Sequence, residues 1–253
     1  MNIILAEASE IIEQQVTLTD YRAEHIVKVL RAEVGDRLRV GILNGGRGFG
    51  TLSAVQKKYP FTATLILNLS EPLGPLPDLD LILALPRPIM LKRVLSQITA
   101  LGVGTIHIIH ARRVEKSFWE AGLLQPLEYR PHLVHGLEQA VDTRLPEIQL
   151  HPKFKPFIED FCPSLVDKYK YLILADPAGE HRLTEIIGNE SGRTLLAVGP
   201  EGGWVDYEIR KFREQGFICC TIGERILKVD TAIIALHASI TALRGRIDGQ
   251  DHR

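Results

Sequence analysis

Short apolar runs recur along the chain from residue 80 onward, and several of them end at glycine or proline. They read DLILAL (80–85), TIHIIH (105–110), YLILADP (171–177), LLAVGP (195–200) and FICCTIG (217–223). Helical patterns separate these runs, for example at 88–102 and 206–216, and a long helix is predicted at 229–246. Strands buried on both faces read as continuous apolar runs, and strands that alternate with helices form parallel sheets. We therefore predict an α/β fold with helices on both faces of a parallel sheet.

The first 70 residues show short alternating runs instead. Two of them flank Asn-Gly-Gly at 44–46, which is a hairpin signal, and 61–69 is predicted as a further strand. A helix is predicted at 20–31. Its apolar face would consist of Ile26, Val29 and Leu30. A small β-barrel with one inserted helix is the simplest fold that fits this pattern.

The stretch EPLGPLPD at 71–78 holds three prolines and a glycine, which is typical of a linker. We therefore expect a first domain at 1–72, a linker at 73–79 and a second domain at 80–253.

The composition excludes several classes of protein. The net charge of −1 neither requires nor excludes a nucleic-acid partner. The three cysteines are too few for a disulfide framework, and their spacing suggests no metal site, so no metal is expected. The N-terminal MNIILAEASE does not resemble a signal peptide, and no apolar run approaches the roughly 20 residues of a membrane span. A cytoplasmic protein without a membrane partner is the expectation.

Three of the predicted strands end in loops with unusual residues. These loops begin at Asp176-Pro177, at Gly199 and at Gly223. Because ligands bind at the carboxyl ends of strands in open parallel sheets, the three loops are expected to line one pocket. The GPEGG turn at 199–203 has no lysine, no serine and no GxGxxG spacing, so it does not fit a phosphate loop. Each loop read alone also fits an ordinary turn, and Asp230 or Thr231 also fits a helix cap.

Two motifs together resemble one known family. GPEGG (199–203) and IGERILKVDTA (222–232) resemble, in order and spacing, motifs of the RsmE family of 16S rRNA (uracil 1498-N3)-methyltransferases, which belong to the SPOUT class. Weaker matches upstream are HIVKVLRAEVGD (25–36), LGV (101–103), Glu138-Gln139 and Arg144-Leu145-Pro146. The resemblance therefore covers nearly the whole chain.

The resemblance implies a fold and a function. The fold would be a SPOUT-type parallel sheet with a C-terminal trefoil knot, an exception to the rule that folds are unknotted, and a PUA-like N-terminal RNA-binding domain. The function would be methylation of N3 of a uridine in 16S rRNA of the small ribosomal subunit, with S-adenosylmethionine as cofactor. The family also implies a homodimer.

The three strand-end loops would hold the cofactor, largely through backbone groups. Glycines would let the backbone approach it, and no lysine is needed because the cofactor is a phosphate-free cation. The implied cofactor-binding residues are Leu174, Ala175, Asp176, Val198, Gly199, Pro200, Glu201, Gly202, Gly203, Ile222, Gly223, Ile226, Leu227, Val229 and Thr231. Glu201 would either favour the sulfonium charge or bridge neighbouring backbone groups.

Arginine is the natural donor to the uracil oxygens on which charge develops when N3 loses its proton. Arg144 and Arg225 are the catalytic candidates because each lies in a matched motif. No general base is assigned; Asp230 is available but also suits a helix cap. The candidate RNA-binding residues are Arg22, Lys28, Arg31, Arg112 and Arg113.

Departures from the family pattern fall mostly on the RNA side. The N-terminal MNIIL lacks the usual arginines, and Asp142 replaces another one. Val205 replaces an N-cap serine, and Trp204 replaces a phenylalanine. Two alternatives therefore stay open: a methyltransferase acting on another RNA base or a ribose, or a noncatalytic RNA-binding assembly factor.

Overall fold

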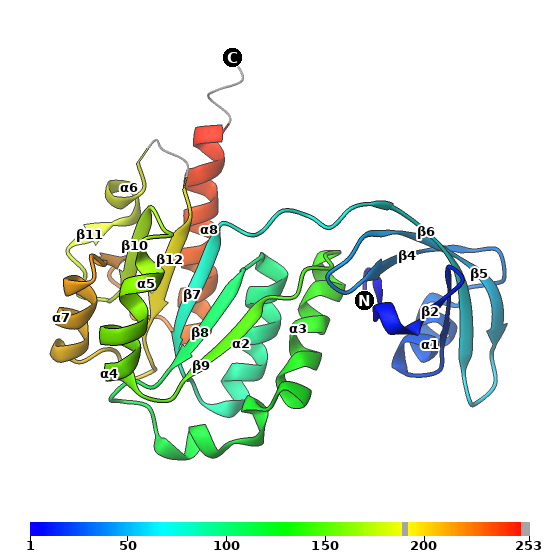
Figure 1. The fold of residues 1–253 in the computed structure, drawn as a ribbon, viewed down its shortest axis with the longest axis horizontal. Helices are drawn as coiled ribbons and strands as arrows, with labels where there is room; N and C mark the ends of the chain where they lie inside the picture. Colours follow the sequence, from blue (N-terminus) through cyan, green and yellow to red (C-terminus); the bar gives the residue numbers. More distant parts are fainter. Residues whose placement is uncertain (189–191, 249–253) are drawn as a thin grey trace. The chain divides into compact units, whose positions relative to one another are not determined.

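The structure is a computed structural model that describes residues 1–188 and 192–248. The chain divides into two units (Figure 1). The first consists of Met1–Leu76 together with Leu133–Leu145, and the second consists of Pro77–His132 and Pro146–Arg253.

A six-stranded sheet in the order β1-β4-β5-β6-β3-β2 forms the first unit, and it is antiparallel except for the β1–β4 pair. Its strands are β1 (Ile4–Ala6), β2 (Ile11–Ile12), β3 (Gln15–Leu18), β4 (Arg37–Ile42), β5 (Arg47–Gln56) and β6 (Thr62–Glu71). The sheet curls around a core that includes Val16, Val40 and Leu65. The predicted hairpin is confirmed as β4–β5, with Asn44 in its turn at φ 55°.

One helical segment lies between β3 and β4, formed by α1 (Tyr21–His25) and η2 (Ile26–Leu30). Asp20 caps it by accepting the backbone N–H of Arg22 at 2.9 Å. The predicted apolar face was wrong in part. Ile26 is buried, but Val29 and Leu30 are exposed because the last turn winds more widely than an α-helix and moves them off the core-facing side.

The segment 133–145 is the least expected part of the first unit. It contains the end of α3 (Pro126–Ala140) and the loop that follows. Leu137 packs with Ile3 and Leu5 in a small apolar cluster. The backbone is tied as well, since the N–H of Asn44 donates to the carbonyl of Thr143 at 2.7 Å.

The second unit is built on a seven-stranded sheet in the order β11-β13-β10-β12-β7-β8-β9, with every neighbouring pair parallel. The strands are β7 (Leu79–Ala84), β8 (Thr105–Ile109), β9 (Glu147–His151), β10 (Tyr171–Ala175), β11 (His181–Arg182), β12 (Thr194–Val198) and β13 (Ile218–Thr221). The α/β fold and the five predicted strands are thereby confirmed. Strand β9 was not predicted, because EIQLH is only half-buried and lacks a continuous apolar run.

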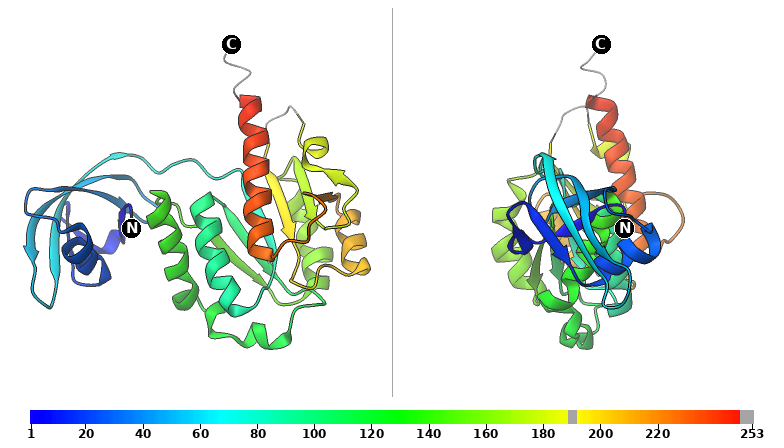
Figure 2. Two further views of the ribbon diagram at one scale, coloured as in Figure 1. Left: turned by 180° about the vertical axis from the view of Figure 1, so that it is seen from behind. Right: turned by 90° about the vertical axis from the view of Figure 1, so that its right-hand side faces the viewer.

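Helices cover both faces of this sheet (Figures 1 and 2). On one face lie α2 (Pro88–Leu101) and α8 (Val229–Asp248), and on the other lie α7 (Asp206–Glu214) and the segment formed by α4 (Phe154–Pro156), η5 (Phe157–Phe161) and α5 (Cys162–Val166). The remaining short helices are η1 (Ala8–Glu10), η3 (Lys116–Glu120), η4 (Gly122–Leu124) and α6 (Leu183–Ile186). Helix α2 buries Leu91, Val94, Leu95 and Ile98, the spacing of one helical face.

Two further observations concern the described residues. All three cysteines are buried free thiols, as the apolar run around Cys219 and Cys220 indicates. Within residues 1–188 and 192–248, no helix combines the length and the apolar character that a membrane span requires.

Candidate functional site

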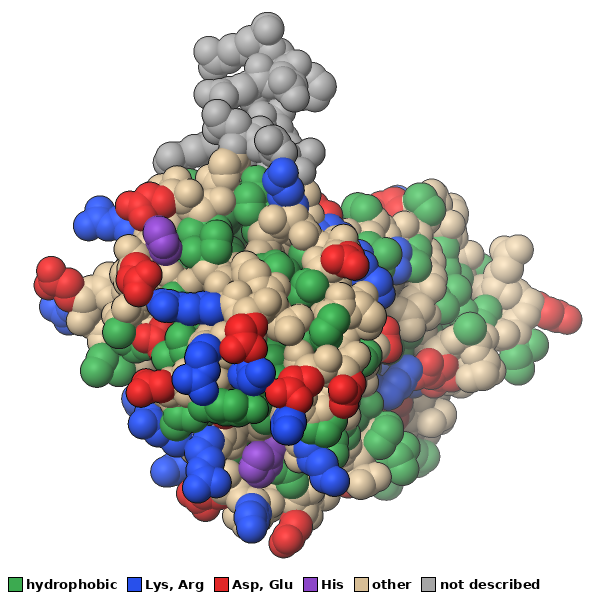
Figure 3. Space-filling view, turned by 60° about the vertical axis from the view of Figure 1, so that its left-hand side comes forward, with side chains coloured by type: hydrophobic (Ala, Val, Ile, Leu, Met, Phe, Trp, Pro, Cys, Tyr) green, Lys and Arg blue, Asp and Glu red, His purple; other side chains and the backbone are tan. Residues whose placement is uncertain are grey.

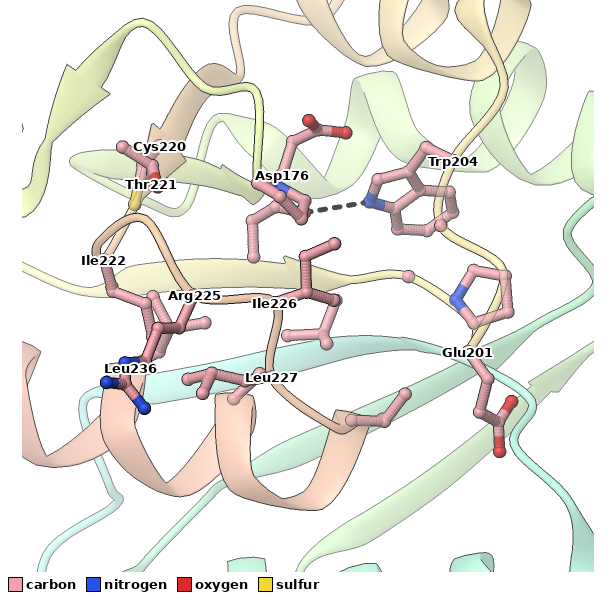
Figure 4. A pocket seen from close by; sticks show the side chains of 18 of the residues that line it. Asp176, Glu201, Trp204, Cys220, Thr221, Ile222, Arg225, Ile226, Leu227 and Leu236 are labelled. Atoms are coloured by element: carbon pink, nitrogen blue, oxygen red, sulfur yellow. Dashed lines mark hydrogen bonds between the residues drawn. The ribbon is translucent and has the colours of Figure 1, made fainter.

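The carboxyl ends of β10, β12 and β13 open into one pocket of about 270 Å³ (Figure 4). The walls come from the loop after β10, the GPEGG turn after β12, the loop after β13 and the first turns of α8. Strands β7 and β12 are neighbours in the sheet, but the chain leaves β7 for β8 on one side and leaves β12 for β13 on the other. In open α/β sheets, ligands bind at the carboxyl ends of strands beside such a reversal of direction.

Trp204 holds two of these walls together. Its indole Nε1–H donates to the carbonyl of Ala175 at 3.2 Å, which joins the GPEGG turn to the end of β10. The ring is 5% exposed and packs edge-on against Phe212 of α7. A Cβ placed on Gly199 would lie only 3.1 Å from the indole. A side chain at 199 would therefore require the Trp204 ring to shift by a few tenths of an ångström.

The two glycines at the end of the turn have different neighbours. Gly203 has φ 74°, a left-handed conformation, and its N–H donates to the carbonyl of Pro200 at 2.8 Å. A Cβ on Gly202 would lie 3.0 Å from the Cδ of Arg113, and Arg113 donates to the carbonyl of Gly202 at 2.5 Å. Gly202 lines the pocket, yet the space beside its Cα is filled by Arg113.

The acidic groups of the pocket bond to backbone. Glu201 accepts the N–H of Arg87 at 3.3 Å, just before α2, and Figure 4 shows its carboxylate directed away from the Trp204 indole. Of its two expected roles, this contact favours the backbone bridge. The Asp176 carboxylate accepts the N–H of Ala178 at 2.8 Å and closes its own turn.

The loop after β13 supplies the apolar wall. Ile222 is 38% exposed and Ile226 is 86% exposed, and both line the pocket, as does the exposed Arg225. Gly223 has φ 145°, which a side chain would strain. Asp230 follows at the start of α8; it accepts the N–H of Thr231 at 2.9 Å and pairs with Arg93 at 3.2 Å. These contacts hold the Asp230 carboxylate within the first turn of α8, after the position of an N-cap.

Most of the expected cofactor residues lie together in this pocket, with two exceptions. Leu174 is fully buried on the strand, because side chains alternate along β10 and Ala175 lines the pocket instead. Thr231 is exposed on α8, where Ala232 and Leu236 line the pocket. The sequence reasoning missed six lining residues: Pro177, Trp204, Cys220, Thr221, Ala232 and Leu236.

The two catalytic candidates belong to different units. Arg225 lines the pocket, whereas Arg144 belongs to the first unit, where its guanidinium donates to the carbonyl of Gly74.

The candidate RNA-binding residues have contrasting surroundings. Arg22 is 8% exposed and forms ion pairs with Glu10 at 2.5 Å and Asp20 at 2.8 Å, an arrangement that favours a structural role. Lys28 is exposed beside Glu24, and Arg31 is exposed. Arg112 is exposed next to Arg113, whose guanidinium braces the GPEGG turn.

Comparison with known families agrees with this architecture. The model of an RNA methyltransferase domain matches residues 74–241, and that of an RNA methyltransferase PUA domain matches residues 18–62. The fold and the strand-end pocket thus define an RNA methyltransferase, an enzyme of the SPOUT type.

Individual proteins narrow the class. The chain is 31% identical to the ribosomal RNA small subunit methyltransferase E of Treponema pallidum, over 96% of this chain and 91% of that protein. It is 26% identical to methyltransferase E 1 of Borreliella burgdorferi, over 93% of this chain and 95% of that protein. The chain therefore belongs to the ribosomal RNA small subunit methyltransferase E family.

A solved structure has the same fold. It is the methyltransferase E of Neisseria gonorrhoeae bound to S-adenosylmethionine, with a TM-score of 0.74 and 21% identity, covering 96% of this chain and 98% of that one.

Proposed function

We propose that this protein transfers a methyl group from S-adenosylmethionine to N3 of a uridine in 16S rRNA of the small ribosomal subunit. The observation that carries the proposal is the pocket at the ends of β10, β12 and β13, which brings both family motifs together. The Neisseria gonorrhoeae relative was crystallised with S-adenosylmethionine, which supports this choice of cofactor.

The chemistry of the pocket fits this cofactor. Its described lining includes no lysine, as suits a ligand without phosphate, and it includes the carboxylates of Asp176 and Glu201. Apolar side chains such as Ile226 and Leu227 would cover the adenine ring, while backbone N–H and C=O groups of the loops would bond to its edge. When bound, the cofactor supplies an electrophilic methyl group.

The chain has two tasks at the uracil. It must hold N3 in line with the methyl group, and alignment of two bound reactants contributes roughly 7–11 kcal/mol to such reactions. It must also favour the form of uracil that has lost its N3 proton. Arg225 is exposed at the pocket and is the donor we assign to the uracil oxygens, where a well-placed donor contributes roughly 3 kcal/mol. Arg144 stays the second catalytic candidate.

Several finer points belong to the same proposal. We expect a homodimer, a C-terminal trefoil knot, RNA contacts from Lys28, Arg31 and Arg112, and a cytoplasmic location. The exposed Ile226 supports the dimer, because a side chain that is 86% exposed on an apolar wall gains from a covering surface.

The test is methyl transfer to small subunits purified from a strain that lacks the gene. The expected product is 3-methyluridine at one position, detected by mass spectrometry of nucleosides. The Arg225→Ala variant should lose about 100-fold in kcat while keeping its affinity for S-adenosylhomocysteine. Methylation of another base or of a ribose would contradict the proposed target, and no methylation with intact cofactor binding would favour the assembly-factor alternative.

A further inference from the structure

A second pocket, of about 630 Å³, lies in the same unit and is called the basic groove below. Its lining consists of His110, Arg112, Val114, Lys116, Phe154, Lys155, Val205, Tyr207 and Glu208. None of these residues lines the cofactor pocket.

The basic groove is built on the same edge of the sheet as the cofactor pocket. Its residues come from the loop after β8, the start of the helical segment after β9, and the start of α7 after β12. The segment 202–204 belongs to the cofactor pocket, and the next residue, Val205, lines the groove. Arg113 crosses this boundary by donating to the carbonyl of Gly202, so the two pockets share a wall.

The one carboxylate that lines the groove is already bonded. Glu208 is 2% exposed, and it accepts the backbone N–H of Arg112 at 2.7 Å and of Val205 at 3.0 Å. These bonds fix the loop after β8 against the start of α7. Because both oxygens of Glu208 accept backbone N–H groups, this carboxylate is not paired with the cations that line the groove.

Three cations surround the opening. Arg112, Lys116 and Lys155 are exposed, and Lys155 lies 3.8 Å from Glu159, a distance too long for a strong ion pair. Figure 3 shows lysine and arginine side chains and a histidine, with acidic side chains among them, over the lower part of the face that carries α4 and α7.

An aromatic ring stands beside these cations. Tyr207 is 39% exposed. The centroid of its ring lies 6.2 Å from the ring centroid of Phe154 and 5.7 Å from the guanidinium of Arg210. Arg210 therefore covers one face of the Tyr207 ring and Phe154 meets the ring at a steep angle, while part of the ring stays open to solvent.

We propose that the basic groove binds an unpaired nucleotide of the substrate RNA beside the target uridine, with its base stacked on Tyr207 and its phosphates held by Arg112, Lys116 and Lys155. This inference rests on the proposed function for its ligand. Cations that track a phosphate backbone, combined with an exposed aromatic ring, are how proteins hold single-stranded RNA. The shared wall with the cofactor pocket places such a nucleotide next to the methyl donor.

The experiment measures steady-state methylation of purified small subunits by single variants. Lys116→Ala and Lys155→Ala should each raise KM about three- to tenfold, and each should reduce the slope of log affinity against log salt by about 1. Tyr207→Ala should raise KM at least fivefold, whereas Tyr207→Phe should stay near the wild type because it keeps the ring. Affinity for S-adenosylhomocysteine should not change.

Lys168→Ala is the matched control. It removes one exposed positive charge just before β10, at the opposite edge of the sheet, and should leave KM unchanged. Binding of a fluorescent single-stranded RNA oligonucleotide is measured in parallel and does not depend on catalysis. If the groove variants bind this RNA and methylate as the wild type does, the inference is overturned. If the wild type binds RNA through these residues but methylates no small subunit, the proposed function fails and the groove stands.

Discussion

At the scale of single residues, the glycines of the GPEGG turn serve three different purposes. Gly199 makes room for the Trp204 indole, Gly202 makes room for the Arg113 stem, and Gly203 adopts a left-handed conformation. The turn is thus shaped by protein side chains. The surface that the turn presents to the pocket depends on that shape. A substitution at Gly199 should therefore change ligand affinity by displacing Trp204.

The Gly199→Ala substitution tests this link. Its methyl group would lie about 3.1 Å from the indole, so Trp204 must shift and its bond to Ala175 should be lost. We expect a loss of stability of about 1–3 kcal/mol and a clear change in tryptophan fluorescence. Affinity for S-adenosylhomocysteine, measured by calorimetry, should fall about tenfold or more.

Two further variants sharpen this test. Adding Trp204→Phe to Gly199→Ala should restore part of the stability, because the smaller ring leaves space for the methyl group, but not the affinity, because phenylalanine cannot donate to Ala175. Gly122→Ala is the control, since a Cβ there meets nothing within 4 Å. An unchanged fluorescence and affinity in Gly199→Ala would show that the wall does not depend on this contact.

His107 provides a prediction about pH. It is 1% exposed on β8, beside His151 and Phe161, and burial lowers its pKa to about 4. The unfolded chain takes up this proton near pH 6.5, and the folded chain does so only near pH 4. The group therefore favours unfolding progressively as pH falls from about 6.5 to 4, by up to about 3 kcal/mol.

Urea unfolding at pH 7 and pH 5 measures this effect. The wild type should lose stability between the two, and His107→Leu should lose less, because the residue that binds the extra proton on unfolding is gone. An equal loss in both proteins would assign the pH dependence to other groups, such as His151, whose pKa is also lowered by burial.

At the scale of elements, one buried carboxylate ties four strands together at the amino edge of the sheet. Asp80 of β7 is 1% exposed; it accepts the N–H of Thr105 of β8 at 2.7 Å and the guanidinium of Arg193, just before β12, at 2.6 Å. The hydroxyl of Tyr169, just before β10, donates to the same carboxylate. The edge opposite the pocket is thereby fixed.

Replacing Asp80 with alanine should therefore affect stability far more than catalysis. Removing one partner from a fully buried ion pair costs about 3–5 kcal/mol of folding free energy. Because Arg193 is partly exposed, the loss here should lie at the lower end of that range. Urea unfolding should show this loss, while kcat at low temperature stays near the wild-type value. Asp78→Ala removes an ion pair in which the carboxylate is exposed and Arg244 is partly buried, and it should cost about 1 kcal/mol. A fall in kcat with little loss of stability would contradict this assignment.

The elements also show what a single sequence can predict. Strands such as β7 and β12 were predictable because both of their faces are buried, which makes all of their residues apolar except Asp80 and Thr194. The meeting of the three loops followed from the parallel order. Strand β9 was not predictable, nor was the role of Trp204, because its partner Ala175 lies 29 residues away in the chain and only the fold brings them together. The exposure of Val29 and Leu30 depended on the wide final turn of a short helix, which periodicity does not reveal.

At the scale of the whole molecule, the first unit is not continuous in sequence. The segment 133–145 belongs to it although the chain has by then passed through β7 and β8. Its contacts are specific. The Thr143 hydroxyl donates to the carbonyl of Gly45 at 2.6 Å, Arg47 donates to the carbonyl of Val141 at 2.5 Å, and Tyr21 donates to the buried Glu138 at 2.9 Å.

A fragment that ends at Leu76 should therefore fold poorly. It keeps the whole six-stranded sheet but loses the side chains that cover Ile3 and Leu5, namely Leu137 and its neighbours. Two buried side chains of this size contribute roughly 1.5–3 kcal/mol each, so the fragment should be less stable than the same unit in the intact chain by roughly 3–6 kcal/mol. That difference is close to the whole stability of many small domains. The carbonyl of Gly45 would also lose the Thr143 hydroxyl that donates to it.

Thermal unfolding of two fragments tests whether the first unit needs residues 133–145 for its stability. One holds residues 1–76 alone, and the other adds residues 133–145 through a flexible glycine-serine linker. The second should unfold cooperatively at a clearly higher temperature, because the added segment restores both the apolar cluster and the bonds to Gly45. Replacing Leu137 with aspartate in the second fragment should cancel the gain, since a charge cannot occupy the site beside Ile3 and Leu5 without a partner. Equal stability of the two fragments would mean that the first unit is complete without the later segment.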